Sequence, residues 1–297
     1  MHFTSWLVLL ATLGLWSGNW IVARAVRDEI APGIATTGRL LIVLTILLPF
    51  VLRSLKPKVA RLTAGDWRIL CALGFTGGGL HLALQWLGLH YTTATSGILY
   101  LSTSPIFILL MAAPLAAERI GMRQWTGVAI SFAGVATIAT HGEFRLVSFN
   151  VGDLMALASM VMWAGYTVLL RVRRDPLDTA ELIVMVCALG LLFMSPWVAW
   201  EVLFDRRISL SPQGALGVVY SAIASMLLAY AGWSYVVTRL GAARAGITMH
   251  LMPAMGVGLA ALFLGEYPRW FHFAGIALIL AGVGLSSFRA SSASSSR

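Results

Sequence analysis

The sequence predicts an all-α integral membrane protein with ten transmembrane helices, arranged as two inverted repeats of five helices with both chain termini in the cytoplasm. Three observations predict this fold class. The 297 residues are unusually apolar, their charged residues gather in short clusters between long uncharged runs, and the two halves of the chain resemble each other at a nearly constant offset.

Composition excludes most classes of soluble protein. Hydrophobic residues make up 59% of the chain and charged residues 11%. Soluble domains contain roughly 45–50% apolar residues and about 25% charged residues. Residues 69–117 contain no Asp, Glu, Lys or Arg. Such a run suffices for two spans of about 20 residues across a hydrocarbon core of about 30 Å, so we expect a chain that crosses the membrane many times.

The uncharged or nearly uncharged windows predict the helices in order. The first, at about 3–23, lacks a basic leader and an Ala-x-Ala-like cleavage site, so we interpret it as a retained span and not as a signal peptide. The second, at 31–52, contains Arg39 as an internal charge. The third and fourth, at 69–90 and 93–117, divide the longest uncharged run.

The second part of the chain continues this pattern after a fifth window at 123–141. The remaining windows are 152–170, 180–201, 212–238, 242–265 and 270–288. A lipid-exposed backbone must satisfy its own hydrogen bonds, and the period-2 alternation of a β-barrel is absent, so all ten windows are expected to be helical. The Ser-rich tail, residues 289–297, has nothing to bury and is expected to be disordered.

Basic residues predict the orientation, because Lys and Arg are retained in cytoplasmic loops. With the N-terminus inside, the cytoplasmic segments hold 14 of the 21 Lys and Arg residues, the outer loops hold six, and Arg39 lies within a span. The net charge of +9 therefore marks the ends of apolar runs and forms no continuous basic face for nucleic acid. The expected partners are the lipid bilayer and a small-molecule substrate.

An internal repeat is the most informative feature for function. At an offset of 147, Trp16, Gly18, Arg24 and Pro49 coincide with Trp163, Gly165, Arg171 and Pro196; at 148, Pro105 and Glu118 coincide with Pro253 and Glu266. The stretch GVAISFAGV from Gly127 also matches GIALILAGV from Gly275 at five of nine positions. Chance recurrence in apolar sequence is the alternative, but a nearly constant register through four helix pairs argues against it.

The repeat predicts two domains, at residues 1–142 and 150–288. Each holds five predicted helices, and because five is odd, the second copy must enter the membrane from the opposite side. Inverted repeats are typical of alternating-access transporters, whose binding site lies near the bilayer midplane between the halves.

The two five-helix repeats, Arg39 in TTGRLLIVL, and the paired Pro and Glu residues of the fourth and ninth helices resemble the EamA-type drug/metabolite transporter superfamily. Within it, the chain is most similar to the YddG-type aromatic amino-acid exporters. The resemblance covers about residues 5–288. It implies a ten-helix basket with a central cavity lined mainly by helices 1, 3, 4, 6, 8 and 9, and with helices 5 and 10 at the periphery.

Polar and aromatic side chains inside the spans are the candidate substrate-binding residues, since a polar group in lipid is costly unless it faces a cavity or a partner. The candidates in helices 1 and 6 occupy corresponding helix faces of the two repeats, so we expect them on opposite sides of the pseudo-symmetry axis. The candidates are Trp16, Asn19, His81, Gln85, Tyr100, Ser104, Trp163, Tyr166 and His250. The alternatives stay open, because tryptophans near span ends belong to the interfacial belt and a lone buried histidine is more often a core residue.

Four further residues are candidate hinges or gates. Pro105 and Pro253 free a backbone carbonyl and permit a bend. Glu118 and Glu266 lie at the ends of corresponding helices and suit a gating or capping role. Arg39 lies mid-span, where a charge costs about 2.5–3.5 kcal/mol on insertion scales, so we expect it to have a partner and to act as a structural tether or as a substrate ligand.

Signatures of catalysis, metal binding and cofactor binding are missing. The chain has no H-E-x-x-H, C-x-x-C or G-x-S-x-G motif, its G-x-G-x-x-A match from Gly256 falls inside an apolar span, and Cys71 and Cys187 stand alone. An integral-membrane enzyme that uses His81 or His250 as a base is a remote alternative, because no carboxylate lies within a helical turn of either imidazole. We therefore expect no enzyme, no metal and no cofactor.

The scarcity of charged residues inside the spans excludes several classes of solute. Phosphate esters would need several buried Lys or Arg residues, and cationic drugs would need a buried carboxylate. A neutral or zwitterionic amphipathic solute fits best, and with the family resemblance this favours export of amino acids such as aromatic residues, Met and Thr. Without a mid-span carboxylate to carry protons, facilitated diffusion is favoured over a proton-coupled drug/metabolite exporter. The excess of Arg over Lys indicates a GC-rich bacterium, so we expect a multi-pass protein of a bacterial inner membrane.

Overall fold

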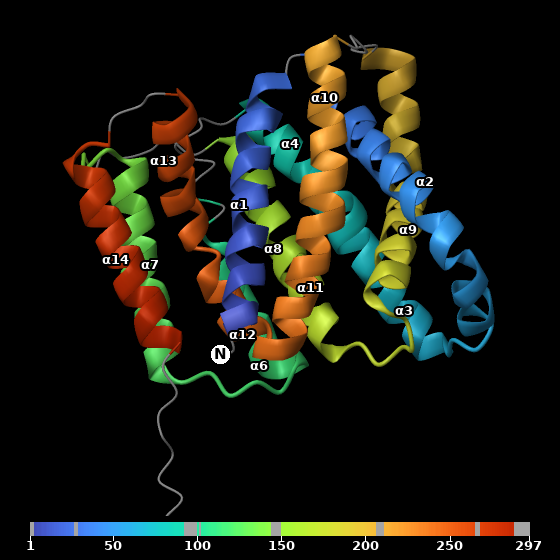
Figure 1. The fold of residues 1–297 in the computed structure, drawn as a ribbon, viewed down its shortest axis with the longest axis horizontal. Helices are drawn as coiled ribbons and strands as arrows, with labels where there is room; N and C mark the ends of the chain where they lie inside the picture. The colour runs from blue at the N-terminus through green and yellow to red at the C-terminus, as the bar shows by residue number, and fades with distance from the viewer. Residues whose placement is uncertain are drawn as a thin grey trace, which may run out of the picture.

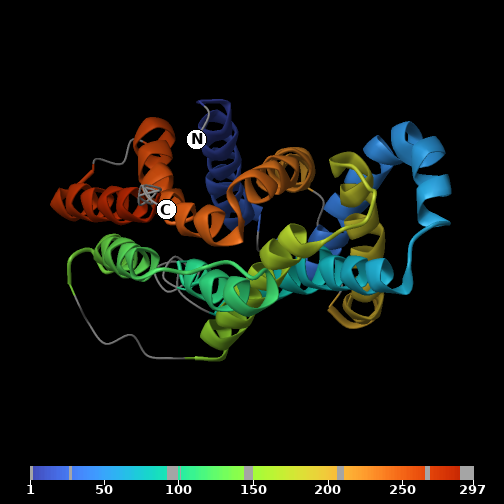
Figure 2. The same ribbon diagram turned by 90° about the horizontal axis from the view of Figure 1, so that it is seen from below.

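The computed structural model describes residues 3–26, 29–91, 100, 102–143, 150–205, 211–264 and 268–287. These residues form helices and short connections, with no β-strand among them, which confirms the all-helical prediction for this part of the chain. Helices of the two halves interleave (Figures 1 and 2). Helix α1 lies beside α11 and α13, while α8 lies beside α4 and α6.

Two π-helical segments divide long rods in the two halves. The first half consists of α1 (Phe3–Val26), α2 (Pro32–Val59), a rod of α3 (Ala64–Leu73), η1 (Gly74–Leu80) and α4 (His81–Tyr91), then α6 (Ser104–Leu115) and α7 (Met122–Ala139). The second half consists of α8 (Val151–Val172), α9 (Thr179–Trp200) with the π-helical end η2 (Glu201–Asp205), a rod of α10 (Pro212–Tyr220), η3 (Ser221–Leu228) and α11 (Ala229–Leu240), then α12 (Ala242–Thr248), α13 (Leu251–Leu264) and α14 (Trp270–Ser287).

Some helix boundaries differ from the predicted ones. Helix α2 continues to Val59 and does not end at residue 52, because charged residues leave the hydrocarbon without ending the helix. Helix α3 begins at Ala64 and not at residue 69, because Thr63 and Asp66 form a capping box: Thr63 N donates to Asp66 Oδ2 (2.9 Å) and Asp66 N to Thr63 Oγ1 (3.2 Å). The tail at 289–297 lies outside the described residues.

The predicted ninth helix is divided. A turn at Met249 and His250 separates α12 from α13. In the first half, a turn at Ser102 and Thr103 precedes α6. Each turn lies next to one of the two proline residues that were expected to permit a bend.

Within the described residues, five helical segments are long and apolar enough to cross a membrane. They are Pro32–Val59, Ala64–Gly88, Val151–Val172, Thr179–Phe204 and Pro212–Leu240, and Ser104–Leu115 and Trp270–Ser286 are shorter apolar helices. Large apolar side chains also point outward; Phe50 is 82% exposed and Leu262 80%. An exposed apolar surface of this kind suits contact with lipid.

Helices α7 and α14 pack side by side at one edge of the molecule, the peripheral position implied for helices 5 and 10 (Figure 1). Glycine makes this contact close. A Cβ on Gly134 would lie 2.5 Å from the carbonyl oxygen of Gly275, and a Cβ on Gly282 would overlap the carbonyl oxygen of Gly127. Small residues let helix backbones approach each other where no hydrophobic effect drives association.

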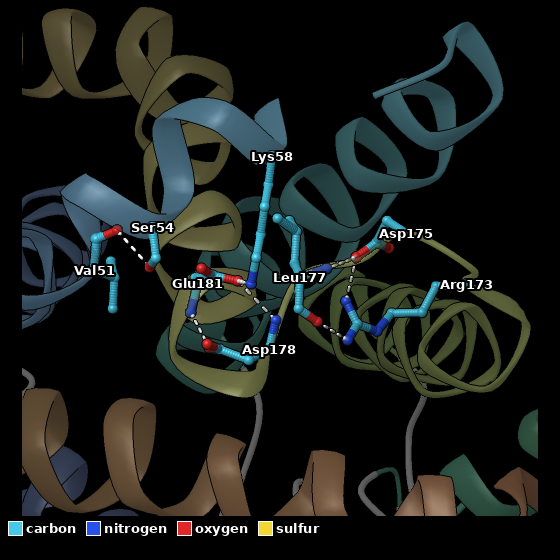
Figure 3. A network of polar contacts seen from close by, with 8 residues as sticks. All are labelled: Val51, Ser54, Lys58, Arg173, Asp175, Leu177, Asp178 and Glu181. Carbon is cyan, nitrogen blue, oxygen red and sulfur yellow. Dashed lines mark hydrogen bonds and ion pairs between the residues drawn. The ribbon is translucent and has the colours of Figure 1, made fainter. Parts of the chain in front are cut away.

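Charged contacts join both ends of the antiparallel pair α2 and α9. At one end, Glu201 accepts hydrogen bonds from the backbone N–H groups of Gly33 (3.0 Å) and Ile34 (2.9 Å) in the first turn of α2. At the other end, Lys58 Nζ lies 2.6 Å from Glu181 Oε2 (Figure 3). The two helices are thus tied together at both of their ends.

Candidate substrate cavity

A cavity lies between the two halves of the chain. Its lining comes from α1, α2, α4, α8, η3, α11, the turn before α13, and α13 itself, and consists of Trp16, Asn19, Arg39, His81, Leu82, Gln85, Trp163, Ser225, Tyr230, Met249 and Met252. The volume of the cavity, taken as the space open to the centres of water molecules, is about 40 Å³. A single water needs roughly 10–15 Å³ by this measure, so the cavity holds a few waters in this conformation and is constricted.

The π-helical segments η1 and η3 bring backbone carbonyl groups to this region. A π-helical turn is wider than an α-helical one and disturbs the regular hydrogen-bond ladder. The carbonyl oxygen of Gly77 in η1 accepts a hydrogen bond from the Tyr230 hydroxyl (2.8 Å), and that of Ser225 in η3 accepts one from Trp16 Nε1 (3.1 Å). Glycine is required at position 77, where a Cβ would overlap the Tyr166 ring.

One wall of the cavity is aromatic. We call Trp16, Trp163, Tyr166, Tyr230 and Trp233 the aromatic cluster. Trp16 and Trp163 meet edge to face with ring centroids 5.1 Å apart, and Trp163 lies 5.6 Å from Tyr230. Ring pairs at such distances contribute about 0.5–1.5 kcal/mol beyond the burial of area. The two tryptophans expected on opposite sides of the centre therefore touch each other.

His81 stands at the edge of the aromatic cluster, 5.0 Å from Trp163 between ring centroids. Its Nδ1 lies 3.0 Å from the carbonyl oxygen and 2.8 Å from the hydroxyl oxygen of Ser159, and this hydroxyl donates to the carbonyl oxygen of His81 (2.9 Å). Because a carbonyl oxygen can only accept, this network assigns the proton of a neutral imidazole to Nδ1. Nε2 is then an acceptor, with no hydrogen-bond partner among the described residues.

Amide side chains supply further polarity to the cavity. Asn19 Oδ1 accepts a hydrogen bond from the Ser221 hydroxyl (2.6 Å), which leaves the Asn19 amide group with two N–H donors. Gln85 lies one helical turn after His81 and lines the same cavity. Together with His81, these residues offer both donors and acceptors to a solute.

Arg39 of α2 also lines the cavity, and its side chain is almost completely buried, with 2% exposed. Its Nη2 donates to Thr36 Oγ1 (3.3 Å), and its Cζ lies 5.7 Å from the centre of the Trp86 ring. Nε has no partner. The partners of Arg39 within the protein are thus a hydroxyl and an aromatic face, and no carboxylate of the described residues pairs with it.

Four predicted site residues lie outside the lining, namely Ser104, Tyr166, Tyr100 and His250. Ser104 is one layer behind it, since its hydroxyl donates to Met249 Sδ (3.5 Å), which also accepts from Trp163 Nε1 (3.1 Å). Tyr166 is buried within the aromatic cluster. Tyr100 is partly exposed and forms a side-chain hydrogen bond with Asp153. Helix 4, which the family resemblance placed in the lining, contributes no described residue, whereas helix 2 contributes Arg39.

His250 connects the two helix breaks and does not line the cavity. It is fully buried, its Nε2 lies 2.8 Å from the carbonyl oxygen of Ser102, and its Nδ1 is hydrogen-bonded to the Ser131 hydroxyl. Both ring nitrogens are therefore occupied by the protein. This geometry suits a residue that holds the turn at Met249 and His250 against the turn before α6.

The other candidate hinge and gate residues take defined positions. Pro105 lies in the first turn of α6 and Pro253 in the first turn of α13, where proline disturbs the helix least. Glu118 accepts hydrogen bonds from the backbone N–H groups of Ala242 (2.7 Å) and Ala243 (3.0 Å), so it caps α12. Glu266 lies outside the described residues.

Comparison with known proteins assigns the family. The model of the EamA-like transporter family matches this chain twice, at residues 3–140 and 150–288. The chain belongs to the EamA-like transporter family. With several helices long and apolar enough to span a membrane, it is a multi-pass membrane transporter of that family.

Several relatives of this EamA protein cover most of its length. An uncharacterized transporter of Archaeoglobus fulgidus is 28% identical over 97% of this chain and 98% of its own. A probable terminal-alkyne amino-acid exporter of Streptantibioticus cattleyicolor is 26% identical over 78% and 76%, and a probable amino-acid metabolite efflux pump of Salmonella typhimurium is 24% identical over 94% and 93%. A solved crystal structure shares the fold, with a TM-score of 0.75 and 20% identity over 97% of both chains.

Five lining residues of the EamA protein were missed by the sequence reasoning. They are Leu82, Ser225, Tyr230, Met249 and Met252. The repeat offset of 148 relates Leu82 to Tyr230 and Gly77 to Ser225, so applying the offset to the segment around His81 would have found two of them. The methionines and Leu82 carry no polar signal and become visible through packing alone.

Proposed function

We propose that this EamA transporter exports small amphipathic solutes that are neutral or zwitterionic, namely amino acids such as the aromatic ones, Met and Thr, across a bacterial inner membrane by alternating access. The observation that carries the proposal is the cavity between the halves, which combines an aromatic wall with the polar groups of Asn19, His81 and Gln85. Sites for small amphipathic molecules have this composition. The names of two relatives, an amino-acid exporter and an amino-acid metabolite efflux pump, agree with it.

Alternating access needs two halves that can exchange conformations, and the repeat supports this. The family model matches each half once. The π-helical segments η1 and η3 begin 147 residues apart and end 148 residues apart. The carbonyl groups that accept from Tyr230 and Trp16, those of Gly77 and Ser225, are separated by 148. We infer ten spans in two inverted sets of five, with both termini in the cytoplasm.

The constricted cavity fits one stage of such a cycle. Pockets for drug-sized ligands are larger, at roughly 300–1,000 Å³. An amino acid does not fit a space that holds a few waters, so the halves must separate on one side before a solute enters.

Facilitated diffusion agrees best with the buried titratable groups. His250 has both ring nitrogens hydrogen-bonded within the protein. His81 is the remaining histidine at the cavity, and its free Nε2 is the feature that favours the alternative, a proton-coupled drug/metabolite exporter. The remote alternative of an enzyme lacks support, because serine hydroxyls and backbone carbonyls, and no carboxylate of the described residues, hydrogen-bond to either imidazole.

Efflux from proteoliposomes tests the proposal. Vesicles containing the purified protein and labelled Phe, Met or Thr should release the unaltered solute faster than protein-free vesicles, without an imposed pH difference. Accumulation against the solute gradient that is driven by protons and abolished by His81→Ala would overturn facilitated diffusion in favour of proton coupling. Release no faster than from protein-free vesicles for every solute would overturn the amino-acid proposal, and a chemically altered product would point to the enzyme.

A further inference from the structure

Arg39 is a buried cation with no carboxylate partner among the described residues. It lies within α2, lines the cavity between the halves, and is 2% exposed. Trp86 and Ser221 lie beside it around a second, smaller gap that is too narrow for a water molecule. A guanidinium group in the interior of a membrane protein is costly unless it is paired or serves a pathway for solutes.

The donors of Arg39 are largely unused. A guanidinium group has five N–H donors and no acceptor. One donor reaches Thr36 Oγ1 at 3.3 Å, and Nε is enclosed with no hydrogen-bond partner in the described part of the chain. The contact with the Trp86 ring, 5.7 Å from Cζ, stabilises the positive charge without using an N–H group. Neutral partners of this kind hold the side chain in place but leave its hydrogen-bonding capacity open.

A structural arginine of the same protein shows the contrast. Arg173 donates from Nη1 to Asp175 Oδ1 (2.7 Å) and from Nη2 to the carbonyl oxygen of Leu177 (2.7 Å), as Figure 3 shows. Arg173 thus has a carboxylate and a carbonyl at short distances, although it is more exposed than Arg39. Arg39 has neither of these partners among the described residues. It faces the cavity, whereas Arg173 faces a loop.

We propose that Arg39 binds the carboxylate group of the transported solute, and hence that this transporter selects solutes with one carboxylate over amines and uncharged amides. The inference rests on the proposed function, because it takes the cavity as the solute site, and it narrows the solute class. The planar guanidinium group matches the two oxygens of a carboxylate in a bidentate pair. The apolar part of the solute then lies against the aromatic cluster, whose Trp16 and Trp163 line the same cavity.

The same lining limits the anion to a single negative charge. Among the described residues, Arg39 is the one Lys or Arg that lines the cavity. A dicarboxylate or a phosphate ester would bring a second negative charge with no cation beside it, which is costly in a membrane interior. Monocarboxylates, including zwitterionic amino acids, are the class that the charge of the cavity fits.

Matched ligand pairs test the inference. The purified full-length protein in detergent is heated with L-phenylalanine or L-phenylalaninamide, and with phenylacetate or phenylacetamide, and the unfolding temperature is measured over a range of ligand concentration. Within each pair the compounds differ little except in the carboxylate. We expect the wild-type protein to bind each carboxylate at least about tenfold more tightly than its amide, and we expect this preference to vanish in Arg39→Gln.

Two further variants keep the test decisive. Asn19→Asp retains the acceptor for Ser221 and adds a carboxylate to the cavity that Arg39 lines. It should abolish the preference for carboxylates in a folded protein even if Arg39→Gln fails to fold. Arg61→Gln makes the same chemical change at an exposed position and should leave the preference intact.

The outcomes separate this inference from the proposed function. If phenylacetate stabilises the wild-type protein and not the Asn19→Asp variant while no amino acid is transported, the carboxylate site stands and the amino-acid proposal fails. If amino acids are transported but the wild-type protein binds acids and amides equally, the inference is overturned. An unchanged preference in a folded Arg39→Gln variant, or in Asn19→Asp, overturns it too.

Discussion

Trp163 lies where three kinds of contact meet. It stacks within the aromatic cluster, lies beside His81, and donates its Nε1–H to Met249 Sδ. Its side chain is 2% exposed, so truncation to alanine removes core packing as well as any solute contact, at a cost of about 3–5 kcal/mol. A substitution that keeps a ring is therefore the better probe of its role.

We expect Trp163→Phe to weaken the transport of aromatic amino acids more than that of Thr. The smaller ring offers less stacking surface, and a loss within the range of about 0.5–1.5 kcal/mol corresponds to roughly a two- to tenfold increase in the KM for Phe. The measurement is concentration-dependent efflux of Phe and Thr from proteoliposomes. Trp270→Phe is the matched control, because that ring is 66% exposed. Equal loss for both solutes in Trp163→Phe would make Trp163 a packing residue.

At the scale of elements, the contact between the end of α2 and the start of α9 depends on one buried carboxylate. The side chain of Glu181 is 0% exposed, and that of Lys58, which pairs with it, is 33% exposed. Glu181 Oε2 also accepts from the backbone N–H of Asp178 (2.9 Å), while Oε1 has no hydrogen-bond partner among the residues that the structure describes. Removing Lys58 would leave a negative charge with too few partners (Figure 3).

Lys58→Met should lower the free energy of unfolding by about 1–3 kcal/mol, the range for leaving a buried charged group without its partner. The double variant Lys58→Met with Glu181→Gln should recover part of that loss, because the remaining group is neutral. Thermal unfolding of the purified protein measures both. Lys56→Met, at an exposed position on the same helix, is the control. If Lys58→Met and Lys56→Met unfold at the same temperature, the pair does not tie α2 to α9.

At the scale of the whole molecule, the sequence predicts helix positions better than it predicts the cavity. Uncharged windows locate helices because lipid demands them; α9 begins at Thr179 and α14 at Trp270, against predicted starts of 180 and 270. The π-helical segments and the turn at Met249 arise from packing between distant helices, which no window shows. His250 illustrates the same limit, since whether it faces a cavity or bonds to Ser102 depends on the partner across the interface.

The Arg39 environment shows which part of the site was predictable. Its mid-span charge is visible in the sequence and predicts a partner. The sequence does not show that the partners are Thr36 and Trp86, or that a cavity lies beside the guanidinium group. Both follow from the packing of α2 against α4 and η3. Charge patterns thus identify residues that need an explanation, and three-dimensional contacts supply it.

The orientation of the whole molecule is the last prediction. The bias of 14 basic residues against six places Lys56 and Arg173 in the cytoplasm and Arg145 and Arg206 outside. Single cysteines at these positions, on a Cys71→Ala and Cys187→Ala background, should react with a membrane-impermeant thiol reagent added to intact cells at 145 and 206 only. Positions 56 and 173 should react after the cells are opened. Because positions 56 and 145 are separated by three predicted spans, their labelling from the same side would contradict the span count between them, and with it the inverted arrangement of the two halves.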